Sequence, residues 1–162
     1  MEEKLSRLLR RGQSLETEAE GLLKINRETA DDGLVLSRDE AMGLARTHRD
    51  ALDNCGRIEI GSGTVEKIAL AFRNSRYLNQ ENYAAVLAEA TEAFYALKNE
   101  SEDMISDDEL ATLLAQGFEQ KGGKLSSYLD SAELDRLLRA RRYGADETEK
   151  EEPGDEEDDA DE

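Results

Sequence analysis

Residues 54–100 read NCGRIEIGSGTVEKIALAFRNSRYLNQENYAAVLAEATEAFYALKNE. A glycine-rich turn, Gly61-Ser62-Gly63, lies near the start of this stretch, and two helical patterns follow it. In the second pattern, five apolar residues recur at spacings of four, three, four and three: Tyr83, Leu87, Ala90, Phe94 and Leu97. This spacing places all five side chains on one face of an α-helix. The stretch therefore predicts two helices after a turn, the second packed along its whole length.

The rest of the chain extends this helical pattern. The 162 residues are enough for one domain with a core of its own. The single proline, Pro153, lies near the end, and abundant Ala, Leu and Glu favour helices. Two capping boxes are predicted, Ser37 with Glu40 and Ser106 with Glu109. We expect an all-α, single compact domain of six or seven helices with one short extended segment near 57–60.

Acidic residues are concentrated at the C-terminus. Residues 144–162 hold twelve Asp or Glu and one Lys, a net charge of −11 out of the chain's −18. Residues 1–143 keep only −7, an ordinary value for a soluble domain. A segment with so few apolar groups cannot offset the entropy cost of becoming ordered. We therefore predict a helical domain over 1–143 and a disordered acidic tail over 144–162, which either keeps the protein soluble or docks on a basic partner.

Several classes of protein are disfavoured. One cysteine, Cys55, rules out an internal disulfide framework and favours a reducing cytoplasm. The sequence contains no run of roughly 20 apolar residues, so no membrane span is predicted. The N-terminus is charged and lacks the apolar run of a secretory signal. Direct binding to nucleic acid is disfavoured because both molecules are anionic. DNA mimicry is disfavoured because it needs carboxylates along a folded surface, whereas most of the net negative charge lies in the tail.

No catalytic residue is predicted. His48 is the only histidine, and no partner group for a catalytic triad stands out in the sequence. It shares a helical stripe with apolar residues, so we interpret it as a histidine at the edge of the core. Cys55 has no second cysteine or neighbouring histidine, and we interpret it as a small core residue.

A calcium loop also fails on its ligands. With Gly56 as the sixth position, the first, third, fifth and twelfth positions of an EF-hand loop are Ala51, Asp53, Cys55 and Ser62. Such a loop needs oxygen ligands at the first three of these and a glutamate at the last, and only one of the four carries a carboxylate. We predict no metal site and no cofactor.

The glycine-rich turn offers an alternative, a site for a small phosphorylated molecule. Helix N-termini bind anions, and Lys67 follows the turn closely. The full phosphate-binding patterns are absent, however, and Glu66 lies where a phosphate would approach. A ligand-binding or enzymatic site around residues 57–67 would use these candidates: Arg57, Glu59, Lys67, Tyr83, Tyr95, Asn99 and Glu100.

The same region carries a family resemblance. Its motifs are Gly56-Arg57-Ile58-Glu59, the glycine-rich turn, Asn82-Tyr83, the run from Phe94 to Glu100, and Asp107-Asp108-Glu109-Leu110. These motifs resemble a family of small uncharacterised bacterial proteins, mostly from Firmicutes, over about residues 34–138. The resemblance implies a bacterial, cytoplasmic protein and implies no activity.

Leucines mark one side of the first predicted helix and recur in the last one, which is rich in arginine. Leu5, Leu8 and Leu9 share one side of a helix predicted over residues 2–11. In the last predicted helix, leucines alternate with a set of arginines that we expect to contact a partner: Arg136, Arg139, Arg141 and Arg142. The sequence thus favours a non-enzymatic cytoplasmic protein that acts through contacts with another protein, and it does not predict an oligomeric state.

Overall fold

The computed structural model describes residues 15–59 and 61–143, and in this part of the chain it contains helices and no strand. Residues 15–23 are helical. They are followed by α2 (Asn26–Thr29), the 3₁₀ helix η1 (Ala30–Asp32), α3 (Arg38–Asn54), α4 (Gly63–Phe72), α5 (Tyr83–Glu100), α6 (Asp107–Gln120), α7 (Leu125–Leu129) and α8 (Ala132–Tyr143). The predicted all-α, single-domain fold is confirmed. The first predicted helix and the acidic tail lie outside the described residues.

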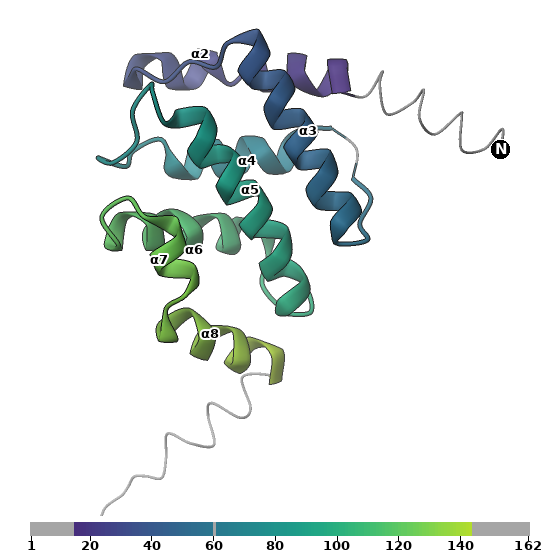
Figure 1. Cartoon of the computed structure of the whole chain (residues 1–162), viewed down its shortest axis with the longest axis vertical. Helices are drawn as coiled ribbons and strands as arrows, with labels where there is room; N and C mark the ends of the chain where they lie inside the picture. The colour runs from purple at the N-terminus through teal and green to yellow at the C-terminus, as the bar shows by residue number, and fades with distance from the viewer. Residues whose placement is uncertain (1–14, 60, 144–162) are drawn as a thin grey trace, which may run out of the picture.

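Helix α5 is the central element of the fold. It packs mainly against α3, and it also contacts α4, α6, α7 and α8 (Figure 1). Its predicted stripe is buried over the whole length of the helix, from Tyr83 at 0% exposure to Leu97 at 5%. Helix α4 packs against α6, where the rings of Phe72 and Phe118 lie 5.3 Å apart.

The predicted caps form, with one difference. Ser37 and Glu40 make both hydrogen bonds of a capping box at the start of α3. At the start of α6, Ser106 accepts from the backbone N–H of Glu109, as predicted. The Glu109 side chain does not return to Ser106, however, because its two carboxylate oxygens pair with Arg141 on α8. The second capping box is therefore only half formed.

The connection between α3 and α4, residues 55–62, positions the candidate site. Gly56, with a φ of 68°, follows the last turn of α3 in the left-handed region that favours glycine. Arg57, Ile58 and Glu59, which belong to the predicted extended segment, have no regular secondary structure and form no strand. No helix in residues 15–59 or 61–143 is long and apolar enough to cross a membrane.

Candidate functional site

His48 lies inside the core and not at its edge. On α3 it is 1% exposed, and its Nδ1 pairs with the carboxylate of Glu18 from the helical residues 15–23. On the other side of the ring, Nε2 lies 3.0 Å from the hydroxyl of Tyr95 on α5 and 3.4 Å from Oε1 of Glu59. We call Glu18, His48, Glu59, Thr64 and Tyr95 the His48 cluster.

Glu59 joins this cluster to the α3–α4 connection. Its Oε1 accepts hydrogen bonds from the Tyr95 hydroxyl at 2.7 Å and from the Thr64 hydroxyl at 3.0 Å. At the far side, the Arg49 guanidinium lies 3.6 Å from the second oxygen of Glu18. Buried charges persist in proteins only when such partners surround them. The cluster thus ties together the helical residues 15–23, α3, α4, α5 and the connection.

The protonation states in the cluster follow from these contacts. Burial by itself lowers the pKa of His48, but hydrogen bonds to Glu18 and Glu59 and their negative charges raise it from 6.5 to about 9. For Glu59, burial raises the pKa, and hydrogen bonds from His48, Tyr95 and Thr64 outweigh this and lower it. Burial, followed by the hydrogen bond to Glu59, raises the pKa of the Tyr95 phenol. At neutral pH the cluster is therefore an imidazolium between two carboxylates, with a neutral phenol as a further donor.

These contacts limit the chemistry of the cluster. A general acid or base must reach the proton of a substrate directly or through one water. Here both nitrogens of His48 face protein partners, and the Tyr95 hydroxyl already donates to Glu59. What the arrangement does is hold charges of opposite sign at fixed places in the core, and so fix the α3–α4 connection on α5.

A second network holds the same connection from its outer side. The Nε of Arg57 donates to Oδ1 of Asn99 at 2.8 Å, and the same guanidinium pairs with Asp103. The side-chain amide of Asn99 in turn donates to the backbone oxygen of Cys55 at 3.0 Å. The Gly56-Arg57-Ile58-Glu59 motif and the run from Phe94 to Glu100, two separate motifs in the sequence, therefore contact each other.

The predicted ligand-binding residues do not share one pocket. Four of them form two pairs, Arg57 with Asn99 and Glu59 with Tyr95. Lys67 points elsewhere and pairs with Asp108 on α6 at 2.8 Å. The remaining two lie on α5: Tyr83 is fully buried in the first turn, and Glu100 is exposed in the last turn.

The acidic residues around the start of α6 are mostly ion-paired. Lys98 lies 2.9 Å from Asp107 and also donates to the backbone oxygen of Ile105. Three other pairs join this region to the α3–α4 connection, to α4 and to α8. They are Asp103 with Arg57, Asp108 with Lys67, and Glu109 with Arg141. Among the described residues, no group of three or more His, Cys, Asp or Glu could hold a metal ion.

The predicted partner-binding arginines differ in their surroundings. Arg141 makes the paired contact with Glu109, and Arg142 donates to the backbone oxygen of Glu100 at 3.3 Å. Arg139 pairs with Asp135 one turn earlier on α8, at 3.3 Å. Arg136 is exposed and makes no ion pair with a residue in the described part of the chain. The arginines at the end of α8 thus contribute to the fold itself.

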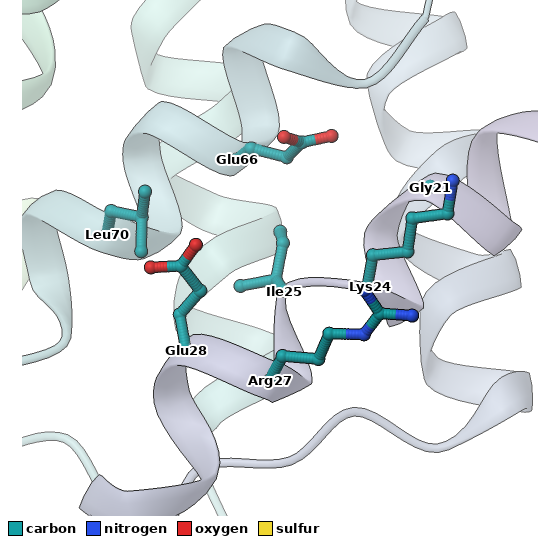
Figure 2. A pocket seen from close by; sticks show the side chains of 7 residues that line it. All are labelled: Gly21, Lys24, Ile25, Arg27, Glu28, Glu66 and Leu70. Atoms are coloured by element: carbon teal, nitrogen blue, oxygen red, sulfur yellow. The ribbon is translucent and has the colours of Figure 1, made fainter.

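A surface pocket of about 220 Å³ lies beside the first turns of α4. Its lining consists of Gly21, Lys24, Ile25, Arg27, Glu28, Glu66 and Leu70. Figure 2 shows that the charged groups do not converge, because the heads of Lys24 and Arg27 lie on one side and the carboxylate of Glu28 lies toward Leu70. One oxygen of Glu66 accepts from the Ser62 hydroxyl at 2.6 Å. The charged side chains of this pocket therefore do not meet at one position where a charged ligand could bind.

Glu18, the partner of His48, was not predicted from the sequence. Glu18 follows Leu15 by three residues and precedes Leu22 by four, so it lies on the apolar stripe of its helix. The structure buries it to 2% exposure. This pairing could have been predicted, because Glu18 lies on the apolar stripe of one helix and His48 lies on the apolar stripe of another.

Comparison with known proteins gives a match to a protein family. No curated protein and no solved structure matches this chain. A family model does match, over residues 21–147, and this range contains the whole of the predicted 34–138. It also contains the Arg57, Glu59, Tyr95 and Asn99 side chains that hold the α3–α4 connection on α5. The protein belongs to the family of unknown function DUF6323.

Proposed function

We propose that this protein is a non-enzymatic, cytoplasmic protein of bacterial origin that acts by binding another protein at the C-terminal end of α5. The observation that supports this is a group of exposed apolar side chains at that end. Ile58 is 93% exposed, Tyr143 is 61% and Met104 is 54%. Among the described residues, these are the three most exposed large hydrophobic side chains. We call them the α5-end surface.

Hydrogen bonds bring these three residues to the same end of the molecule. Ile58 follows Arg57, which is bonded to Asn99 and to Asp103. Met104 is the residue after Asp103. Tyr143 follows Arg142, whose guanidinium donates to the backbone oxygen of Glu100 and stacks 5.2 Å from the Tyr143 ring. The C-terminal ends of α3, α5 and α8 accordingly lie on the same side of the molecule in Figure 1.

The position of Ile58 favours a role in binding over chance exposure. Its neighbours Arg57 and Glu59 are both anchored to α5, so the backbone on each side is held while the isoleucine points to solvent. Exposed apolar groups that gather in one place mark interaction sites, whereas scattered ones are normal. A side chain presented on a fixed backbone also loses less entropy when a partner binds.

Charge favours a partner with basic residues. Tyr143 is followed directly by residues 144–162, which carry twelve Asp or Glu and one Lys. A protein with an apolar patch bordered by Lys and Arg complements both features. Charge complementarity of this kind raises the rate and specificity of association more than the affinity itself.

Contacts at the glycine-rich turn give no support to a phosphorylated ligand. Lys67, the cation nearest the turn, is bound to Asp108. The carboxylate of Glu66 lies beside Ser62 at the start of α4, where a phosphate would be repelled. We therefore propose protein binding alone.

The test uses the full chain as bait in a lysate of the source organism. Ile58, Met104 and Tyr143 are changed together to Ser, and the matched control changes Val35, Leu70 and Tyr77 to Ser, three apolar residues that are 36–40% exposed elsewhere. We expect the wild type and the control to retain the same protein and the α5-end variant to lose it. A chain lacking residues 144–162 should retain it with a slower association rate.

Two results would contradict the proposal. One is that the wild type retains no protein in an amount comparable to the bait. The other is that both triple variants retain the same protein equally well. Circular dichroism of each variant shows whether its helices are intact, since the three side chains of the α5-end surface make few contacts in the fold.

A further inference from the structure

A narrow apolar groove lies next to the α5-end surface, between α5, α7 and α8. Its floor consists of Leu97, Leu134 and Leu138, each at most 5% exposed. Ala93, Ala96 and the half-buried Leu129 complete the apolar lining. The last turn of α5 contributes Glu100, so the groove adjoins the α5-end surface.

The size of the groove suits one side chain and not a metabolite. Its volume is about 180 Å³, whereas pockets for small molecules have about 300–1,000 Å³. A cavity of about 150 Å³ accommodates a single benzene-sized group. A leucine side chain of a protein segment is of this size.

The charged residues at the rim of the groove indicate which residues should flank a leucine that binds in it. The two charged residues that line the groove, Glu100 and Asp135, are both carboxylates. Glu100 forms no side-chain ion pair within the described part of the chain. Asp135 pairs with Arg139 at 3.3 Å on the exposed face of α8. An occupant with Arg or Lys next to its leucine would pair with both, whereas an acidic segment would be repelled.

We propose that this groove binds residues 4–11 of a second copy of the chain. These residues read KLSRLLRR, with three leucines and four of the chain's 21 Lys and Arg, and no acidic residue. The other stretch of this kind, residues 136–142, is part of α8, and its Leu138 already lines the groove. Figure 1 shows the helical residues 15–23, in purple, at the opposite end of the molecule from α8, so a second copy is better placed to supply the segment.

This self-association goes beyond the proposed function and does not depend on it. The groove residues are separate from Ile58, Met104 and Tyr143. A variant that blocks the groove therefore leaves the α5-end surface unchanged, and the two proposals can fail separately.

Photo-crosslinking in the full chain tests the groove. A photoreactive benzoyl-phenylalanine replaces Leu8 in a tagged copy, which is mixed with an untagged copy before irradiation. We expect crosslinks between the two copies that map to residues 93–100 or 129–138. Ala96→Trp in the untagged copy, which fills the groove from its exposed rim, should reduce their yield by about tenfold, as loss of one buried anchor does.

The matched control is Ala85→Trp, which adds the same ring at an exposed position three turns earlier on α5. It should leave the yield unchanged. Crosslinks within one copy only, crosslinks mapping outside these two segments, or an equal yield with Ala96→Trp and Ala85→Trp would each overturn the proposal. Circular dichroism of both variants should show the helical content of the wild type.

Discussion

His48 shows how a single ionisable residue can hold a helical fold together. Its ring lies between the carboxylates of Glu18 and Glu59, and it is 1% exposed. A buried ion pair contributes little net stability when it is intact, because desolvation offsets the attraction. Loss of one partner is costly, since it leaves the other charge buried alone. Replacement of His48 should therefore lower the free energy of unfolding by much more than the intact ion pair contributes to it.

The raised pKa of His48 predicts how stability varies with pH. The folded protein binds this proton more tightly than the unfolded chain, with a pKa of about 9 against 6.5. The resulting stabilisation is complete below pH 6.5 and is lost as the pH rises through 9. Because one pKa unit corresponds to about 1.4 kcal/mol, the free energy of unfolding should fall by on the order of 3 kcal/mol over this range. Urea denaturation at pH 6, 7.5 and 9 measures it.

The control for this prediction is His48→Gln, which should be less stable at pH 6 and lack the decrease toward pH 9. A wild-type decrease that persists unchanged in the variant would show that other groups cause it. On the acid side the sign is opposite, because the pKa of Glu59 is lowered from 4.5. Its contribution is present above that value and is lost as the pH falls below it.

At the scale of elements, α6 and α7 meet through a glycine. A Cβ atom placed on Gly117 would lie 2.2 Å from ring carbons of Tyr128, so only glycine allows α7 to approach this closely. Gly117→Ala should lower the free energy of unfolding by about 1–3 kcal/mol, the usual cost of overpacking, although alanine favours a helix. Urea denaturation gives this difference.

Gly43→Ala on α3 is the matched control, since its Cβ would meet nothing within 4 Å. There the gain in helix propensity acts alone, and the variant should be more stable by about 0.5–1 kcal/mol. If the two substitutions changed stability in the same direction, close packing at Gly117 would not be the cause.

The elements could be predicted where their signal is local. The stripe of α5 and the cap of α3 depend on residues three or four positions apart, and both formed as expected. The cap of α6 also looked local, but Arg141 lies 32 residues from Glu109 and binds its carboxylate more favourably than a backbone N–H does. A local rule failed there because a distant charge competed for the same group.

The candidate site was harder to predict for the same reason. Tyr95 lies 47 residues from His48, and Glu18 lies 30 residues before it. Periodicity shows that each belongs on a buried face, but it does not show which faces meet. The motifs around Arg57 and Asn99 stand out in the sequence, whereas their contact with each other depends on how α3 and α5 pack.

At the scale of the whole molecule, the core ends within α8. Leu134 and Leu138 are the last residues of the hydrophobic core, and most of the chain's net charge lies beyond residue 143. Removal of residues 144–162 should therefore change the free energy of unfolding by no more than about 0.5 kcal/mol. Urea denaturation of the full and shortened chains, with circular dichroism as the readout, measures this.

A chain that ends at residue 130 is the comparison for this prediction. It lacks α8, together with Leu134, Leu138 and the pair between Arg141 and Glu109. Its loss of stability should be several times larger, since each buried leucine contributes about 2 kcal/mol. Equal stability of the two shortened chains would place the domain boundary before α8.

The two networks beside Ile58 hold the α3–α4 connection through the neighbouring residues and leave Ile58 itself exposed to solvent. Arg57 and Glu59 carry the bonds to α5, while the isoleucine between them is 93% exposed. Position 58 can therefore accept almost any side chain without a cost in folding. In the laboratory it is a site where a dye or a short recognition sequence can be attached while the bonds of Arg57 and Glu59 to α5 stay intact.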